Sequence, residues 1–214
     1  GTLTKNEMTV RKVELVDYKM LYEFIRTAVV CNTASLVAKE GDGVDILGDS
    51  MEGALLIWAD EQGANVDSLK EKAKKIKEIP FDSKRKMMSV VVEEDGKTVL
   101  LAKGAPEVIL ELCGLSEKGK QKLTEDYENM AKQGLRILAL ACRDFSGKKL
   151  PDELEQNLEF LGLVGIADEP REEALESIAK ARRAGIEIVM ITGDNQLTAK
   201  AIGEEVELLQ KGDE

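Results

Sequence analysis

Apolar and polar positions in the first third of the chain follow a helical pattern. Apolar side chains in residues 17–38 recur every three or four positions, which predicts an amphipathic helix. Those side chains are Leu21, Phe24, Ile25, Ala28 and Val29. A second helix is expected over residues 51–61, because residues 48–50 provide an N-cap and Gly63 provides a stop.

The middle of the chain has the pattern of a β-hairpin followed by helices and further strands. Two runs rich in β-branched residues, 88–93 and 97–101, flank the pair Asp95-Gly96, which is a strong signal for a two-residue hairpin turn. The other expected elements are a helix that Pro106 opens, a helix over 117–132 that Gly134 closes, and strands over 135–142 and 158–166. Residues 8–167 are therefore predicted to form an α+β domain with an antiparallel sheet and flanking helices.

From residue 171 onward the pattern changes to an alternation of helix and strand. A helix is expected over 171–184, a strand over 186–191 and another helix from Gln196. This rhythm is typical of a parallel-sheet α/β domain, in which ligands bind at the carboxyl ends of the strands. We place the change of domain near Pro170, which interrupts the passage from strand to helix.

The composition excludes several kinds of chemistry. The 214 residues include 30 Lys and Arg against 41 Asp and Glu, a formal net charge of -11, and this field repels nucleic acid and anionic lipid. The sequence has no His and no Cys-x-x-Cys pair, so His triads, His bases and zinc sites are excluded, and no metal site is expected. Cys31, Cys113 and Cys142 are predicted to be reduced core cysteines. Apolar runs fall far short of the ~20 residues that span a bilayer.

One segment nearly fits a phosphate-binding P-loop and is rejected. Residues 114–121 have the glycine and lysine spacing, but Gln121 stands where a Ser or Thr hydroxyl would hold magnesium. The segment also follows an expected helix, whereas a P-loop follows a strand. We predict an ordinary loop between two helices.

Two segments carry residue types that suit a nucleotide. Residues 80–89 combine Phe81 with a run of cations, and an aromatic face with nearby cations can hold a base and phosphates. Lys103 projects from a strand end, and Gly104 lets the backbone pass close to a ligand. From the residues alone, a Phe beside a strand is more often a core residue, and a Lys at a strand end is more often solvated.

Short motifs along nearly the whole chain resemble, in the same order, those of the P-type cation-transporting ATPases, especially the calcium-pump-like branch. The motifs are Gly1-Thr2-Leu3-Thr4, Gly48-Asp49-Ser50-Met51-Glu52, Phe81 with Lys86 and Ser89, Lys103-Gly104-Ala105-Pro106-Glu107, Gly134-Leu135-Arg136 and Thr192-Gly193-Asp194. The resemblance implies a nucleotide-binding domain at residues 8–167. It also implies two remnants of a haloacid-dehalogenase-like phosphorylation domain, at 1–7 and 168–214.

The resemblance implies a role in ATP binding for six residues. Phe81 would stack on adenine, Lys86 would lie at the pocket, Lys103 would sit deep in it beside Gly104, Glu52 would recognise the adenine amino group, and Arg136 would reach the phosphates. Ser83 stands where several relatives carry a basic residue, so Lys84 or Arg85 is left to contact a phosphate there. Glu52 also suits a first helical turn, where the helix dipole stabilises it, and Arg136 also suits a surface ion pair.

Other matches concern phosphoryl transfer and a hinge. Thr2, Thr192, Gly193 and Asp194 match residues around the transferred phosphate, and Asp168 and Arg171 match a hinge motif in which Glu169 departs from the usual Pro. The family's nucleophilic Asp would precede Gly1, and its magnesium-binding segment would follow Glu214. We therefore expect this chain alone to bind ATP without hydrolysing it, whereas the intact parent would use Mg²⁺ as well.

This interpretation places the chain on the cytoplasmic face of a membrane protein, as a soluble part. Its partners would be ATP and the phosphorylation, actuator and membrane domains of the pump, with no nucleic acid. Two alternatives remain: a fragment of a haloacid-dehalogenase-like phosphatase, which leaves residues 103–107 unexplained, and a non-catalytic interaction domain with a degenerate pocket. Binding of ATP, and its loss when Phe81 or Lys103 is replaced, separates them.

Overall fold

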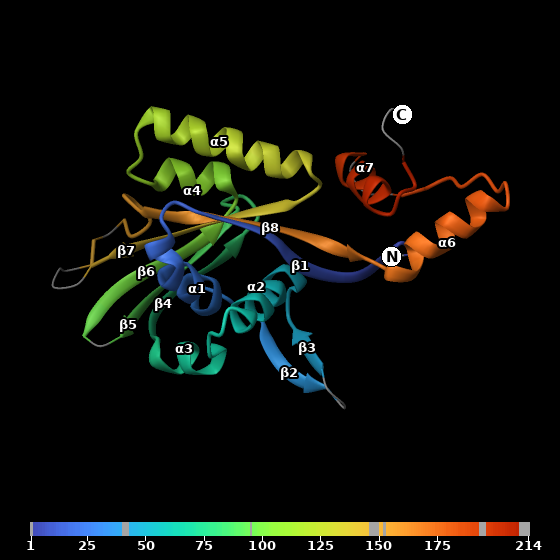
Figure 1. Cartoon of the computed structure of the whole chain (residues 1–214). Coiled ribbons are helices and arrows are strands. Elements are labelled where there is room, and N and C mark those ends of the chain that lie inside the picture. The colour runs from blue at the N-terminus through green and yellow to red at the C-terminus, as the bar shows by residue number, and fades with distance from the viewer. Residues whose placement is uncertain are drawn as a thin grey trace.

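Six antiparallel strands form the central sheet, in the order β1-β8-β7-β6-β5-β4 (Figure 1). The computed structural model describes residues 2–39, 43–94, 96–145, 150–151, 153–192 and 196–209. The strands of the sheet are β1 (Thr4–Leu15), β4 (Lys74–Asp82), β5 (Met87–Glu94), β6 (Lys97–Gly104), β7 (Arg136–Asp144) and β8 (Glu159–Pro170). An antiparallel sheet with flanking helices agrees with the α+β class predicted from the sequence.

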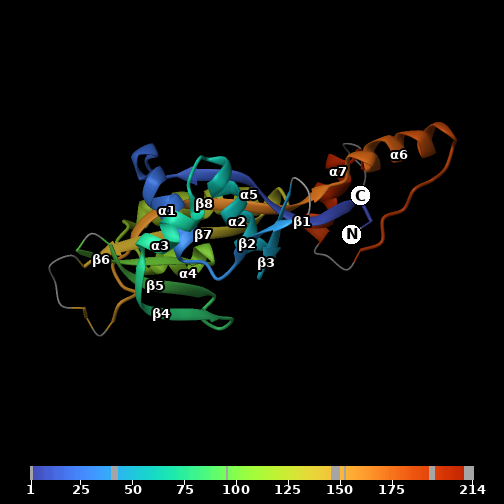
Figure 2. The ribbon, with the colours of Figure 1, turned by 90° about the horizontal axis from the view of Figure 1, so that it is seen from below.

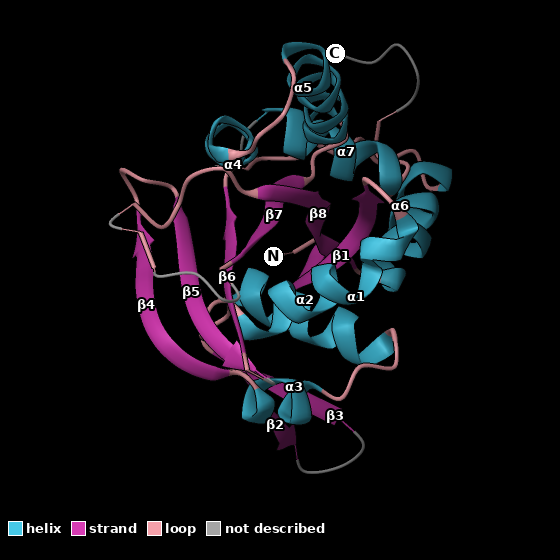
Figure 3. Cartoon of the chain, turned by 90° about the vertical axis from the view of Figure 1, so that its left-hand side faces the viewer, coloured by secondary structure: helices cyan, strands magenta, loops and turns pink. Residues whose placement is uncertain are grey.

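Helices cover both faces of this sheet (Figure 3). On one face lie η1 (Tyr18–Met20), α1 (Leu21–Val30), α2 (Ser50–Glu61) and α3 (Val66–Lys72), and on the other lie α4 (Pro106–Leu112) and α5 (Glu117–Lys132). Alternation along the strands divides the core in two. Leu101 packs toward α1 and α2, whereas its neighbour Leu100 packs toward α4 and α5. Each buried side chain of this size stabilises the fold by ~1.5–3 kcal/mol.

The predicted hairpin and the helices after it are confirmed. β5 and β6 pair without a break from Met87 opposite Gly104 to Glu94 opposite Lys97. Pro106 occupies the first turn of α4. The P-loop-like segment is an interhelical loop only in part: residues 114–116 connect α4 to α5, whereas 117–121 already form the first turns of α5. Ser116 caps α5 by accepting a hydrogen bond from the Gly119 N–H at 3.2 Å.

The helix predicted over residues 17–38 is too long. α1 ends at Val30, and the chain continues into β2 (Ser35–Lys39), which pairs only with β3 (Gly43–Leu47) among the described strands. The cause is Asn32, whose side-chain Nδ2 donates to the Ala28 carbonyl at 3.0 Å. A side chain that takes the place of the next backbone donor ends a helix, and hydrophobic periodicity does not register such a bond.

β1 is the largest element that the sequence pattern did not predict. It pairs with β8 from Thr4 opposite Pro170 to Leu15 opposite Gly162. Polar side chains alternate along it with half-buried apolar ones such as Met8 and Val10, so it lacks the continuous apolar run that marked β5. The proposed domain limits at residues 7/8 and 167/168 fall inside β1 and β8, which continue across them.

Beyond the sheet, β1 and β8 extend as a ribbon to a small C-terminal piece, the described part of residues 171–209 (Figure 2). It contains α6 (Glu172–Arg183) and α7 (Gln196–Glu205). Its core cluster unites Ala174, Ile178, Val206 and Leu208 with Leu3 from the other end of the chain. The piece therefore joins segments that are far apart in the sequence.

The strand predicted over residues 186–191 does not form. These residues have no regular structure, and Val189 and Ile191 are 74% and 94% exposed. A buried parallel strand needs partner strands on both sides to satisfy its backbone and cover its side chains. Among the described residues no strand lies beside this segment. Ile186, Val189 and Ile191 therefore remain exposed, while Ile188 and Met190 pack in part against the small cluster of the C-terminal piece.

The cysteines and the lengths of the helices can be compared with the expectations from composition. Cys31, Cys113 and Cys142 are free and buried, as predicted, and burial raises the pKa of the Cys31 thiol to about 12, which keeps it unreactive. Within the described part of the chain, no helix is long and apolar enough to cross a membrane.

Candidate functional site

The residues with implied nucleotide roles gather at one end of the sheet. β4 and β6 end there, at Asp82 and Gly104, while β5 and β7 begin there, at Met87 and Arg136. In an antiparallel sheet the end of one strand lies beside the start of the next. It is also the end from which β1 and β8 continue toward the C-terminal piece (Figure 2).

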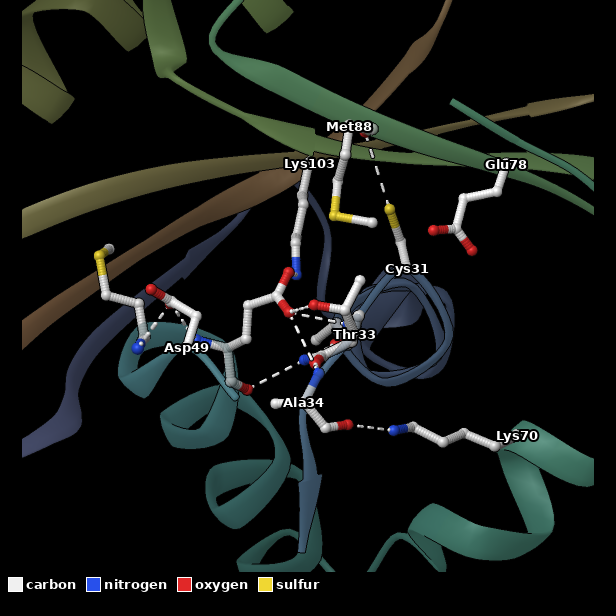
Figure 4. Close-up of polar contacts among 12 residues, drawn as sticks. Cys31, Thr33, Ala34, Asp49, Lys70, Glu78, Met88 and Lys103 are labelled. Carbon is white, nitrogen blue, oxygen red and sulfur yellow. Dashed lines mark hydrogen bonds and ion pairs between the residues drawn. The ribbon is translucent and has the colours of Figure 1, made fainter. Parts of the chain in front are cut away.

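Lys103 projects from β6 toward α2. On the same face of β6, Val99 and Leu101 pack under α1 and α2, and Lys103 itself stands opposite Met88 of β5 and Leu140 of β7. Figure 4 shows its side chain directed at the start of α2. A cation is thus carried into an otherwise apolar core face, where only 5% of the residue is exposed.

Glu52, in the first turn of α2, meets this cation. Its Oε1 lies 2.5 Å from the Nζ of Lys103, and Asp49 caps the helix by accepting from the N–H groups of Met51 and Glu52. Burial alone would raise the pKa of Glu52. The positive charge of Lys103, together with hydrogen bonds from Thr33, outweighs burial and holds the pKa of Glu52 below its usual value.

The second oxygen of the same carboxylate sits in a cradle that the sequence did not reveal. Oε2 of Glu52 accepts from the Thr33 backbone N–H at 2.8 Å, from the Thr33 hydroxyl at 2.5 Å and from the Ala34 N–H at 3.2 Å (Figure 4). Lys70 of α3 donates to the Ala34 carbonyl at 2.6 Å. The Nδ2 of Asn32 donates to the backbone carbonyl of Glu52 at 2.9 Å. The segment after α1 is therefore built around Glu52.

A register irregularity in β4 turns Phe81 toward the face of the sheet that carries Lys103. The register with β5 slips between Ile79 and Asp82, and alternation counted back from Asp82 turns Phe81 toward the face that carries Lys103. The Phe81 residue is 63% exposed. Its ring is therefore accessible to a planar ligand, and the alternative of a core Phe does not apply.

Gly104 permits a close approach within the protein itself. A Cβ at this position would lie 2.5 Å from the Met87 Cβ and 2.6 Å from the Lys86 carbonyl oxygen. That carbonyl accepts from the Ala105 N–H at 2.9 Å. The glycine thus lets the end of β6 pack on the start of β5, next to Lys103.

The cations of the β4–β5 turn differ in their partners. Lys86, which has a left-handed φ of 54°, places its Nζ 2.9 Å from Oε1 of Glu107 on α4. Arg85 pairs with Glu155 at 2.7 Å. Lys84 makes no side-chain ion pair with any described residue, so it is the cation of this turn that is not already engaged.

Arg136 lies on the same face of β7 as Leu138 and Leu140, which belong to the core under α1 and α2. It is exposed at the start of the strand, opposite Ile166 of β8. No ion pair or side-chain hydrogen bond joins it to the described residues, which argues against the surface ion pair left open by the sequence.

The implied hinge residues tie the two strands of the ribbon together. Asp168 of β8 accepts from the Glu7 N–H at 3.0 Å. Arg171 donates through Nε to the Thr4 carbonyl at 3.0 Å and through its backbone N–H to the Leu3 carbonyl at 2.9 Å. They therefore hold the connection between the sheet and the C-terminal piece and do not line the end of the sheet.

Thr2 and Thr192, from opposite ends of the chain, line one cavity. This cavity of about 640 Å³ lies between the start of β1, the segment 188–192 and α7. The other two residues of the implied phosphate site, Gly193 and Asp194, lie outside the described residues. In the part of the chain that is described, no cluster of three or more acidic, Cys or His side chains could hold a metal ion.

Comparison with known proteins places this geometry in a family. Residues 20–173 match the family model described as "P-type ATPase, cytoplasmic domain N". The chain is 34% identical to "Calcium-transporting ATPase 1" of Lactococcus lactis and 35% identical to "Calcium-transporting ATPase" of Bacillus subtilis, with 100% and 99% of the chain aligned. It is also 32% identical, over its full length, to "Sodium/potassium-transporting ATPase subunit alpha-A" of Artemia franciscana.

These matches cover 26%, 25% and 26% of the respective relatives, so the chain spans about a quarter of their length. The chain belongs to the P-type cation-transporting ATPase family and contains its cytoplasmic domain N.

Proposed function

We propose that this chain binds ATP at the end of the sheet that carries Glu52, Phe81, Lys103 and Arg136. The observation that supports this most directly is the buried Lys103. Its Nζ approaches Glu52 but has no hydrogen-bond partner of good geometry among the described residues. Unsatisfied donors on a buried ammonium cost free energy, typically ~1–3 kcal/mol or more for a charged group. A ligand atom that accepts a hydrogen bond there would remove this cost.

The order of the side chains suits a nucleotide that lies along the end of the sheet. The ring of Phe81 offers a stacking face worth ~1–3 kcal/mol for one base. Glu52 and Lys103 would meet the polar edge of that base. Arg136, on the same face but nearer to the ribbon, would meet the phosphates, and Lys86 would do so after leaving Glu107. After the costs of association, a dissociation constant between about tens of micromolar and millimolar is expected.

Beyond the base, the phosphates would point toward the C-terminal piece. There we assign Thr2, Thr192, Gly193 and Asp194 to the surroundings of the transferred phosphate, with residues 1–7 and 168–214 as parts of a haloacid-dehalogenase-like phosphorylation domain. Asp168 and Arg171 would form the hinge between that domain and the nucleotide-binding domain, residues 8–167. The assignment is supported by the shared cavity of Thr2 and Thr192 and by the bonds of Asp168 and Arg171 across the ribbon.

In the parent protein, this part would serve a pump that transfers a phosphoryl group from ATP to an aspartate, with Mg²⁺, and uses it to move a cation, Ca²⁺ in our proposal. The choice of ion rests on the similarity to the calcium-transporting ATPases of Lactococcus lactis and Bacillus subtilis. Its partners would be the actuator, membrane and remaining phosphorylation domains. Phosphoryl transfer needs an in-line nucleophile and a metal ion. We assign both to the remaining phosphorylation domain of the parent, so we expect no ATP hydrolysis by this chain alone.

Isothermal titration of the chain with ATP tests the proposal, using Phe81→Ala and Lys103→Met as site variants. Each should weaken ATP binding about tenfold or more, from the loss of stacking or of a charge-assisted contact. Tyr18→Ala is the control, because Tyr18 is 79% exposed and follows β1 at the opposite end of the sheet. Equal affinity in the wild type and both site variants would contradict the proposal. Absence of binding by the wild type would favour a non-catalytic interaction domain.

A further inference from the structure

The two oxygens of the Glu52 carboxylate have different surroundings. Oε2 receives three hydrogen bonds, from Thr33 N, Thr33 Oγ1 and Ala34 N, whereas Oε1 faces only the Lys103 amino group. A carboxylate offers about four acceptor positions over its two oxygens. Oε2 is therefore saturated, and the acceptor capacity that remains lies on Oε1, beside Lys103.

We infer that Thr33 determines which purine this site accepts, by holding Glu52 so that Oε1 stays fixed as a hydrogen-bond acceptor. The inference rests on the proposed ATP site. Thr33 acts through Glu52 and is thus a positioning residue. Nothing in its sequence neighbourhood indicated this role, because its partner lies 19 positions away.

The chemistry of the base explains why a fixed acceptor matters. The 6-amino group of adenine donates hydrogen bonds, so it is stabilised by a carboxylate oxygen. A 6-oxo purine such as hypoxanthine presents an acceptor at the same place, so two oxygens would face each other with no proton between them. Sites that commit a buried polar group to one substrate group discriminate strongly against the analogue that cannot pair with it.

Because Lys103 lies beside Glu52, the orientation of Glu52 decides whether the base meets a hydrogen-bond acceptor or a donor. Its Nζ has donors without a partner among the described residues, so it could pair with a 6-oxo group if the carboxylate moved aside. The Thr33 hydroxyl, with two backbone N–H groups, prevents that movement. Without the hydroxyl, Glu52 can rotate, and the pair can offer either an acceptor or a donor to the base.

The chain provides a matched set of variants. Thr33→Val keeps the shape of the side chain and removes the hydroxyl, and Thr33 is exposed, so the core is unaffected. Thr33→Ser restores the hydroxyl. Thr27→Val is the control, because Thr27 is a fully buried threonine of α1 whose hydroxyl has no hydrogen-bond partner among the described residues.

The experiment measures dissociation constants for ATP and inosine triphosphate by isothermal titration. The ratio of the inosine triphosphate constant to the ATP constant should fall about fivefold or more in Thr33→Val, as expected for loss of a hydrogen bond to a charged group. It should keep its wild-type value in Thr33→Ser and Thr27→Val. An unchanged ratio in Thr33→Val, with ATP still bound, would overturn the inference and leave the proposed function intact. Failure of the wild type to bind ATP would instead refute the proposed function.

A second readout on the wild type needs no variant. The carboxyl carbon of Glu52, followed by NMR, should shift when ATP binds and shift less when inosine triphosphate binds. Equal shifts with both nucleotides would also overturn the inference, whether or not Thr33→Val folds.

Discussion

The sheet body, which is the sheet with its flanking helices, buries its apolar side chains far more completely than the C-terminal piece does. The sheet body has one apolar cluster on each face of the sheet and a further one among its helices, with Leu100, Leu101, Leu140 and Leu163 fully buried. The C-terminal piece has one small cluster, and its most apolar segment leaves Ile191 94% exposed.

The end of the sheet where we propose that the base binds therefore lies in a body that completes its own core. The implied phosphate end lies in a piece that lacks neighbouring strands among the described residues. This difference explains why ATP binding is expected of the chain and phosphoryl transfer is not.

The largest expected effect is a loss of stability, and it tests the difference in core packing between the sheet body and the C-terminal piece. Leu101→Ala should lower the free energy of unfolding by about 2–5 kcal/mol, because it leaves a cavity in a closely packed cluster. Ile178→Ala, in the C-terminal piece, should cost well under half as much, since its small cluster can collapse or open locally. Urea unfolding followed by circular dichroism measures both. Equal losses would mean that the two regions form one cooperative core.

The second prediction concerns pH and the Glu52–Lys103 pair. The folded-state pKa of Glu52 is lowered, so its contribution to stability is complete above the unfolded value of about 4.3. That contribution is lost as pH falls from there through the folded pKa. Urea unfolding between pH 6 and pH 3 should show a steeper loss in the wild type than in Glu52→Gln. Parallel curves would show that Glu52 titrates alike in the folded and unfolded states.

The smallest expected effect concerns the ion pair between Lys86 and Glu107. Glu107→Gln should strengthen ATP binding about twofold to threefold, because Lys86 no longer has to leave a carboxylate, and exposed pairs are worth about 0–1 kcal/mol. Glu111→Gln is the matched control, since Glu111 lies on α4 like Glu107 but pairs with Lys120 of α5, at 2.9 Å. Unchanged or weaker ATP binding in Glu107→Gln would show that Lys86 does not contact the nucleotide.

The sequence predicted elements well where local signals decide them. The β5–β6 hairpin, α4 and α5 follow from a turn pair, a proline and a cap. Predictions failed where a side-chain bond or a distant contact decides the structure. Asn32 ends α1 through a side-chain bond to Ala28, and β1 depends on the distant β8 for its pairing. Among the described residues, 186–191 have none of the partner strands that their apolar pattern requires.

The candidate site likewise contains residues that the sequence identified and residues that only the folded structure reveals. Lys103, Glu52 and Phe81 were identified because they belong to motifs of a known family, and the structure brings Lys103 and Glu52 into contact. The Thr33–Ala34 cradle could not be predicted, because it forms only when the segment after α1 folds against the start of α2.

The most direct test of the central claim is a two-dimensional amide NMR titration of the chain with ATP. We predict saturable shifts around Glu52, Phe81, Lys103 and Arg136, which disappear in Phe81→Ala, and little change around Ile178 and α7. Shifts confined to the cavity of Thr2 and Thr192, or no shifts at several millimolar ATP, would contradict it.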